Sequence, residues 1–144
     1  MTVVQAHGKA HPETIEIANL WPGVQGELAM HMQKEELMLF SYIKRLVHTK
    51  AGESQAVAPR FGSAAAMIPK MEAEHEATGD GLAQIAALSD NYTPPADACP
   101  TYRTLYVLLQ EFEAVTKKHV HLENNILFPR AIEMERETVA SSGM

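Results

Sequence analysis

Disulfides, long apolar runs and concentrated positive charge are missing from this 144-residue sequence. Cys99 is the only cysteine, which excludes an internal disulfide and predicts a reducing, cytoplasmic setting. No apolar run approaches the roughly 18 residues that a membrane span needs. The first residues, MTVVQAHGKAH, lack the basic and apolar regions of a signal peptide. With a net charge of -6 and no basic patch, the chain is expected to bind neither nucleic acid nor membrane.

What remains is the composition of an ordinary globular protein, with 46% hydrophobic and 21% charged residues, and it predicts one domain over 1–144. No segment shows the alternation of a strand, so the fold is expected to be all-α. Pro22 and Pro69 suit the first turn of a helix, Gly52 suits a stop, and Pro129 predicts a kink. These signals predict an irregular N-terminal segment over 1–20, helices over about 22–50, 69–89 and 98–137, and loops at AGESQAVAPRFGS and SDNYTPPADACP.

Each expected helix carries one face on which apolar residues recur at spacings of three and four, the period of a buried helix face. Polar residues interrupt these faces at a few positions, and each face includes a histidine. Lys34, in contrast, is expected in solvent. Glu74 is also expected in solvent, and the alternative is a place near the site, beside His75, as a proton relay. The predicted buried faces are Leu28, His31, Glu35, Met38 and Tyr42; Ile68, Met71, His75, Thr78, Leu82 and Ile85; and Leu105, Leu109, Phe112, Thr116, His119, Glu123 and Ile126.

Five of these residues could bind a metal: His31, Glu35, His75, His119 and Glu123. A single buried histidine is usually a hydrogen-bonded core residue. A histidine and a glutamate four residues apart usually make a local helix contact worth about 0.2–0.5 kcal/mol. Three imidazoles and two carboxylates facing one another are different, because left unpaired they would cost several kcal/mol. The repetition of the pattern therefore favours a metal site.

The kind of ligand narrows the choice of metal. Imidazole with carboxylate and no thiolate suits iron, manganese or zinc. Two glutamates can each bridge two ions, which would leave the imidazoles as terminal ligands of a dinuclear centre. The order here is His then Glu at a spacing of four, unlike the Glu-x-x-His of ferritin-like di-iron proteins. The H-E-x-x-H motif of zinc proteases is absent from the sequence.

Four motifs, HMQKEELMLF, MEAEHEATGDGL, NYTPPADAC and HVHLENNILFPRA, occur in an order that resembles the hemerythrin-like domain of the repair-of-iron-centres di-iron proteins. The resemblance runs from about residue 3 to 135. It implies an up-down helical bundle that holds two non-haem irons, with glutamates as bridges and histidines as terminal ligands. By motif, the ligands would be His31, Glu35, His75, His119 and Glu123. It also implies repair of iron–sulfur clusters damaged by nitric oxide or peroxide, with iron–sulfur proteins as clients.

The chain departs from this family in two respects. The resemblance implies a cysteine-containing N-terminal domain and a first bundle helix that supplies another histidine, and neither is found here. Three long helices would leave one side of the bundle open, which predicts a homodimer that covers it. Water, His7, His11 or an imidazole of a partner chain could take the place of the histidine. Two other functions stay open: a hemerythrin-type module that binds gas or iron without turnover, and an oligomeric helical protein with an impaired metal site.

Overall fold

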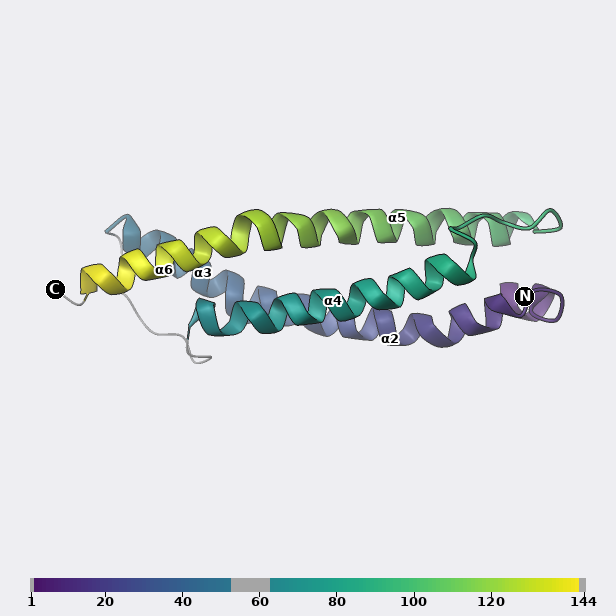
Figure 1. Cartoon of the computed structure of the whole chain (residues 1–144), viewed down its shortest axis with the longest axis horizontal. Coiled ribbons are helices and arrows are strands. Elements are labelled where there is room, and N and C mark those ends of the chain that lie inside the picture. Colours follow the sequence, from purple (N-terminus) through teal and green to yellow (C-terminus); the bar gives the residue numbers. More distant parts are fainter. Residues whose placement is uncertain (1, 53–62, 143–144) are drawn as a thin grey trace. The chain divides into compact units, whose positions relative to one another are not determined.

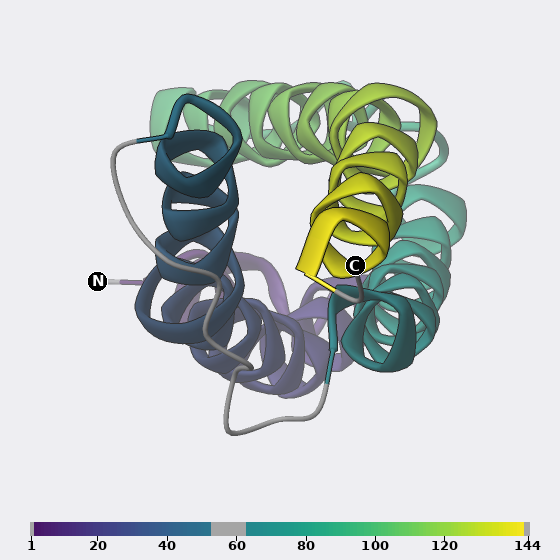
Figure 2. The same ribbon diagram turned by 90° about the vertical axis from the view of Figure 1, so that its left-hand side faces the viewer.

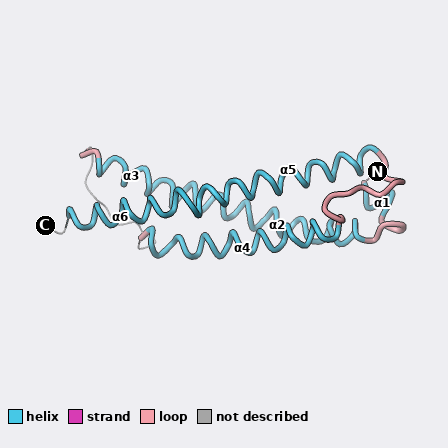
Figure 3. Tube along the Cα trace, turned by 45° about the horizontal axis from the view of Figure 1, so that its top comes forward, coloured by secondary structure: helices cyan, strands magenta, loops and turns pink. Residues whose placement is uncertain are grey.

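The computed structural model describes residues 2–52 and 63–142, and all regular elements in these ranges are helical (Figure 3). The all-α prediction is thus confirmed. Within the described residues, no helix has both the length and the apolar character needed to cross a bilayer. Most of the loop predicted at AGESQAVAPRFGS, residues 53–62, lies outside the described residues.

Three long helical stretches carry the fold (Figure 1). The first consists of α2, η1 and α3, the second is α4, and the third consists of α5, η2 and α6; η1 and η2 are single π-helical turns. The bounds are α1 Val3–His7, α2 Glu13–Lys34, η1 Glu35–Leu39, α3 Phe40–Lys50, α4 Ala64–Leu88, α5 Pro100–Leu122, η2 Glu123–Leu127 and α6 Phe128–Ser142.

The prediction of an irregular segment over residues 1–20 is wrong, because α1 and the first turns of α2 occupy it. Thr2 caps α1 in a reciprocal pair with Gln5, which satisfies two backbone N–H groups at the helix start. α2 begins at Glu13, where acidic residues favour a helix N-terminus, and it continues through Pro22. Pro22 therefore lies inside the helix, where it removes one backbone donor without ending the helix.

The second helix also begins earlier than predicted, at Ala64 instead of Pro69. A carboxylate from α6 makes this start possible. Glu135 accepts hydrogen bonds from the backbone N–H groups of Ala64, at 2.7 Å, and Ala65, at 3.2 Å. It also accepts one from the hydroxyl of Tyr42, at 2.5 Å. Because the cap comes from a residue 71 positions away along the chain, no local sequence signal could reveal it.

The third helical stretch does not end at Pro129, and the irregular turn there is η2, just before α6. The first stretch ends after Lys50, and Gly52 follows in a left-handed conformation with φ +79°, as its role as a stop predicts. The structure thus extends the third helix beyond its expected range of 98–137 and confirms the stop of the first.

The two π-helical turns change which residues are buried within and directly after them. A π-turn takes one more residue than an α-turn, so every later side chain moves round the helix. Met38 and Ile126, predicted on buried faces, are exposed. Leu39 and Phe128 are fully buried in their place. Both errors lie three residues after a glutamate that begins a π-turn, and they share this cause.

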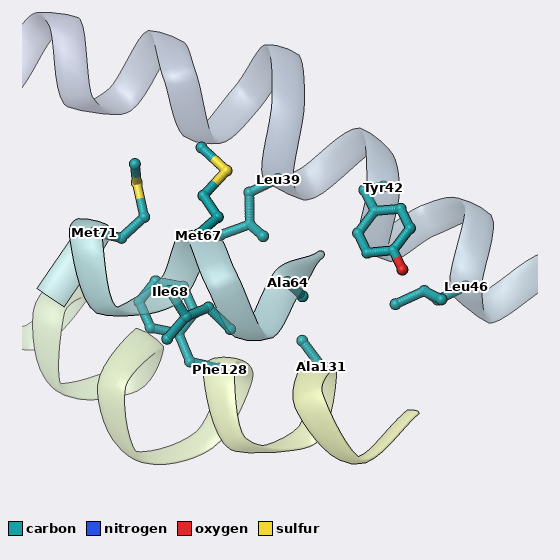
Figure 4. Packing of buried hydrophobic residues seen from close by; sticks show 9 residues of the cluster. All are labelled: Leu39, Tyr42, Leu46, Ala64, Met67, Ile68, Met71, Phe128 and Ala131. Carbon is teal, nitrogen blue, oxygen red and sulfur yellow. The ribbon is translucent and has the colours of Figure 1, made fainter. Parts of the chain in front are cut away.

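The chain divides into two compact units. Unit 1 consists of Met1–Leu28 and Glu76–His119, and unit 2 consists of Ala29–His75 and Val120–Met144. Each has its own apolar core. The core of unit 1 contains Ile17, Val24, Leu82, Ile85, Tyr92, Tyr102, Tyr106 and Leu109. The core of unit 2 contains Leu39, Tyr42, Leu46, Ala64, Met67, Ile68, Met71, Phe128 and Ala131 (Figure 4).

In unit 2, α3 packs against α6, and the two helices finish at the end of the unit that faces the viewer in Figure 2. Figure 4 shows Met67 beside Leu39, and Ala64 of α4 opposite Ala131 of α6. The two small alanine side chains leave room for these helices to approach closely. This core lies in the same unit as the polar residues described next.

Candidate metal centre

Four of the five predicted ligands come together in unit 2. His31 comes from the end of α2 and Glu35 from the start of η1. His75 comes from α4 and Glu123 from the start of η2. All four side chains are buried, and each offers one ligand atom within 4.8 Å of the others. Both glutamates occupy the first residue of a π-turn, an element found frequently at functional sites.

The distances show how closely the ligand atoms converge. The Nε2 atom of His31 lies 2.6 Å from Oε1 of Glu35 and 2.8 Å from Nε2 of His75. The His75 Nε2 atom is 3.4 Å from Oε1 of Glu35 and 3.6 Å from Oε1 of Glu123. Two imidazole nitrogens and two carboxylates therefore surround one small volume, each imidazole presenting the same ring atom.

The opposite ring nitrogens are held outside this volume. The Nδ1 of His31 bonds Oε2 of Glu74 at 2.7 Å, and the Nδ1 of His75 bonds Oδ1 of Asn124 at 2.9 Å. A carboxylate or amide oxygen can only accept, so both Nδ1 atoms donate and carry the ring hydrogen. Glu74 is fixed in turn by Lys34, at 2.6 Å. These contacts leave the Nε2 atom of each ring available to bind a metal. In metal sites of proteins, hydrogen-bond partners outside the coordination sphere orient the ligating histidines in the same way.

Hydrogen bonds and charge interactions within the cluster together change the pKa values of its residues more than burial does. Burial alone would lower the pKa of His31, but hydrogen bonds to Glu35 and Glu74 raise it. Burial also opposes protonation of His75, yet hydrogen bonds to Glu123 and Glu35 raise its pKa to about 10. For Glu35, burial favours a higher pKa, and bonds from His31 and His75 hold the pKa well below its usual range. Imidazole and carboxylate thus share protons that a bound cation would displace.

The donor set fits a hard or intermediate divalent or trivalent cation. Two carboxylates this close repel one another unless a proton or a cation lies between them. Two neutral imidazoles and two carboxylates, without sulfur, are ligands that iron accepts readily. Because the four come from three helical stretches, the site forms only when unit 2 is folded. The arrangement can bind metal and is too buried for an ordinary surface salt bridge.

His119, the fifth predicted ligand, is not among the four residues that the structure brings together. It lies at the end of α5, half-buried, one helical turn before Glu123, and belongs to unit 1. Its role as a ligand stays a prediction.

The two N-terminal histidines, considered above as replacement ligands, have other neighbours in unit 1. His11 bonds the two carboxylate oxygens of Asp97, at 2.8 and 3.0 Å. His7 packs edge-on against Tyr102, with ring centroids 5.0 Å apart. Neither belongs to the group that could hold a metal ion.

Sequence reasoning found the outer partners of the histidines only in part, because a place near the site was no more than an alternative for Glu74. Glu74 and Lys34 were expected in solvent, whereas Glu74 contacts His31 and links it to Lys34. Asn124 was not considered at all. The available signal was position alone, since Glu74 precedes a predicted ligand and Asn124 follows one. Which way these side chains turn depends on the π-turn at Glu123 and on the packing of α4, which the sequence does not display.

Comparisons with known proteins show a family that the chain resembles over most of its length. The profile of the family described as hemerythrin HHE cation binding domain matches residues 2–131. Relatives include the iron–sulfur cluster repair protein YtfE of Yersinia pseudotuberculosis serotype IB (strain PB1/+), 40% identical over 133 residues, which cover 92% of this chain and 54% of the relative. The YtfE of Yersinia pseudotuberculosis serotype O:1b (strain IP 31758) is 45% identical over 109 residues, covering 76% and 43%. The chain thus spans about half the length of these relatives.

Proposed function

The chain belongs to the hemerythrin HHE cation-binding family, and from this premise we propose that it holds a non-haem di-iron centre and acts in the repair of iron–sulfur clusters. The relatives that match over nearly the whole chain are iron–sulfur cluster repair proteins by name. We further propose that the chain works in the cytoplasm during nitrosative or oxidative stress, a setting that suits a chain with a single cysteine.

One observation carries the metal proposal: four buried ligands, two imidazoles and two carboxylates, converge within 4.8 Å. Glu35 and Glu123 would hold the ions, because each carboxylate offers two oxygens. His31 and His75 bind through Nε2, the ring atom that their outer hydrogen bonds leave available. His119 is the proposed further ligand.

Bound iron would supply the change of oxidation state and the open coordination positions that such repair chemistry needs. The protein's own contribution is to hold the ligands and exclude water. Leu39 and Phe128 are both fully buried, and they respectively end and follow the π-turns that carry the two glutamates. The dry surroundings strengthen the attraction between carboxylate and cation. Glu74 and Asn124 keep both imidazoles in the orientation that metal binding requires.

Anaerobic reconstitution tests the metal proposal. The chain is loaded with Fe(II), freed of excess metal, and its iron content and absorption spectrum are measured. We expect about two irons per chain, the number a pair of bridging glutamates implies, and loss of both from a Glu35→Ala, Glu123→Ala double variant. The exposed neighbour gives the control, because Glu36→Ala should retain iron. A wild-type chain that binds no iron, or a double variant that keeps a dinuclear centre, would contradict the proposal.

A separate measurement tests repair. The iron-loaded chain is mixed with an iron–sulfur hydratase whose cluster nitric oxide has damaged, and recovery of hydratase activity is followed. Recovery that depends on Glu35 and Glu123 supports the repair role. Iron binding with reversible gas adducts but no recovery would favour a hemerythrin-type binding module. Substoichiometric iron in a folded chain would favour an oligomeric protein with an impaired site.

A further inference from the structure

Glu135 is a buried carboxylate of unit 2 that lies outside the ligand cluster. It comes from α6, and its Oε2 atom accepts a hydrogen bond from the Tyr42 hydroxyl of α3, at 2.5 Å, and one from the backbone N–H of Ala64, at 2.7 Å. Its Oε1 atom accepts one from the backbone N–H of Ala65, at 3.2 Å. We call these four residues the Glu135 clamp. One side chain thereby ties α6 to both α3 and the start of α4.

The clamp joins the three helical stretches that supply the clustered ligands. In each stretch a clamp residue and a ligand lie about two to three turns apart on continuous helix. Helical segments of this length are stiff, so a shift or rotation at the clamp is transmitted to the ligand in the same stretch. The pairs are Glu35 and Tyr42, seven residues apart; Ala64 and His75, eleven residues apart; and Glu123 and Glu135, twelve residues apart.

A helix cap alone does not account for the clamp. α4 already has a local cap, because the Ser63 hydroxyl accepts a hydrogen bond from the backbone N–H of Ala66 at 3.0 Å. The remaining N–H groups at a helix start can be satisfied by water or by nearby side chains without burial of a charge. A buried carboxylate is costly unless donors hold it, and one of the donors here, Tyr42, belongs to another helix. What the distant carboxylate adds is a fixed arrangement of α3, α4 and α6.

We propose that the Glu135 clamp positions the metal centre, by holding the three stretches in the arrangement in which the four clustered ligands converge. The inference rests on the metal binding proposed above, and Glu135 is a positioning residue that is not itself among the ligands. A cation binds tightly only where its ligands converge at fixed distances, so the chain with a closed clamp binds it better than the chain with an open clamp. Coupling of this kind is reciprocal, and the bound cation therefore stabilises the closed clamp by the same factor.

Metal affinity tests the first half of this coupling. The Fe(II) affinity of the full chain is measured anaerobically by competition with a chelator, at a temperature where circular dichroism shows every variant folded. Tyr42→Phe removes only the hydroxyl, and Glu135→Gln keeps the shape of the side chain without its charge. Each should weaken Fe(II) binding about fivefold or more. The double variant should bind within about twofold of the weaker single variant, because both changes open the same clamp.

Two controls separate positioning from stability. Ser63→Ala removes the local cap of α4, and Leu46→Ala truncates a core side chain of α3, while both leave the clamp groups in place. Each should keep the Fe(II) affinity within about twofold of wild type. Clamp variants that bind Fe(II) as tightly as wild type, or controls that lose as much affinity as the clamp variants, overturn the inference. A wild-type chain that binds no Fe(II) would instead contradict the metal proposal on which the inference rests.

Hydrogen exchange tests the reciprocal half and needs no variant of the clamp. Zn(II), which is diamagnetic and accepts the same donor set, is added to the wild-type chain, and amide exchange is followed by NMR. We expect Zn(II) to slow exchange of the Ala64 and Ala65 amides, the clamp's own donors, about fivefold or more. In a Glu35→Ala, Glu123→Ala double variant, Zn(II) should change neither amide. Slower exchange beside His75 with no change at Ala64 and Ala65 would show that the clamp is a helix cap alone.

Discussion

At the scale of the residue, the site depends on atoms that do not touch its centre. A histidine can bind metal through either ring nitrogen, and the partner of the other nitrogen decides which. Here Glu74 and Asn124 hold the Nδ1 atoms of His31 and His75, so both rings present Nε2 to the carboxylates. The two partners differ in their surroundings, because Glu74 also contacts the half-exposed Lys34. Asn124 therefore offers the cleaner test.

We expect Asn124→Leu to weaken metal binding by about 10- to 100-fold. The change removes the oxygen that accepts the Nδ1 hydrogen of His75, so the ring loses its fixed orientation and tautomer. Competition with a metal chelator measures the affinity. Asn125→Leu changes the exposed neighbour on the same turn and should alter affinity by less than about twofold. Equal losses in the two variants would show that general damage to η2 is responsible.

At the scale of the element, the two π-turns set the register of the first and third helical stretches. Each begins at a glutamate of the site and contains exposed apolar residues, Leu37 and Met38 in η1 and Ile126 in η2. The extra residue lets Glu123 face the ligand cluster while Phe128 faces the core. An uninterrupted α-helix could not place both, because the side chains after the turn would be rotated by about 100°.

Deletion of Ile126 should convert η2 to an α-turn, so that Glu123 and Phe128 can no longer both take their positions. Either Glu123 leaves the cluster or Phe128 leaves the core. We expect loss of iron binding in the first case, and in the second case a fall of about 3 kcal/mol in the free energy of unfolding, the cost of losing a large core side chain. Equilibrium denaturation and iron analysis measure the two effects. Ile126→Ala shortens the same exposed side chain without changing the spacing and should alter stability by less than about 0.5 kcal/mol.

The π-turns also mark where the sequence stopped being sufficient. Periodicity identified His31, Glu35, His75 and Glu123 correctly as buried, since each lies before or within the first residue of a π-turn, or on α4, which has none. It failed at Met38 and Ile126, because the α-helical period no longer applies inside the π-turns. The free-energy cost of a π-turn is offset by contacts between residues that are distant in the sequence. No local sequence pattern therefore predicts the turn.

Helix boundaries could be predicted where their cause is local in the sequence, and could not where the cause is a distant residue. Gly52 ends the first helical stretch through its own backbone conformation, and the sequence predicted this. Pro22 and Pro69 suggested helix starts that the structure does not use. A proline interrupts one hydrogen bond, but packing of the surrounding helix outweighs that loss. The true start of α4 depends on the distant carboxylate of Glu135.

At the scale of the whole molecule, the chain has two cores, and the clustered ligands belong to one of them. The ligand cluster of unit 2 gathers two buried carboxylates and two buried histidines, an arrangement that cations would stabilise. The core of unit 1 contains tyrosine and aliphatic residues, and α1, α2 and α5 of that unit also line an apolar groove. The sequence predicted a single domain without this division, because the long helices contribute residues to both units.

Removal of metal should therefore destabilise unit 2 more than unit 1. A ligand that binds only the folded state stabilises it by about 2.7 kcal/mol when present at 100 times its dissociation constant. Hydrogen exchange of the iron-loaded chain, before and after treatment with a chelator, measures local stability. We expect chelation to speed exchange most in 64–75 and 120–138, which contain His75 and Glu123, and less in 76–88 and 100–115. In the Glu35→Ala, Glu123→Ala variant the chelator should change exchange in neither unit. Equal acceleration in both units would show that the cation stabilises the chain through ligands other than this cluster.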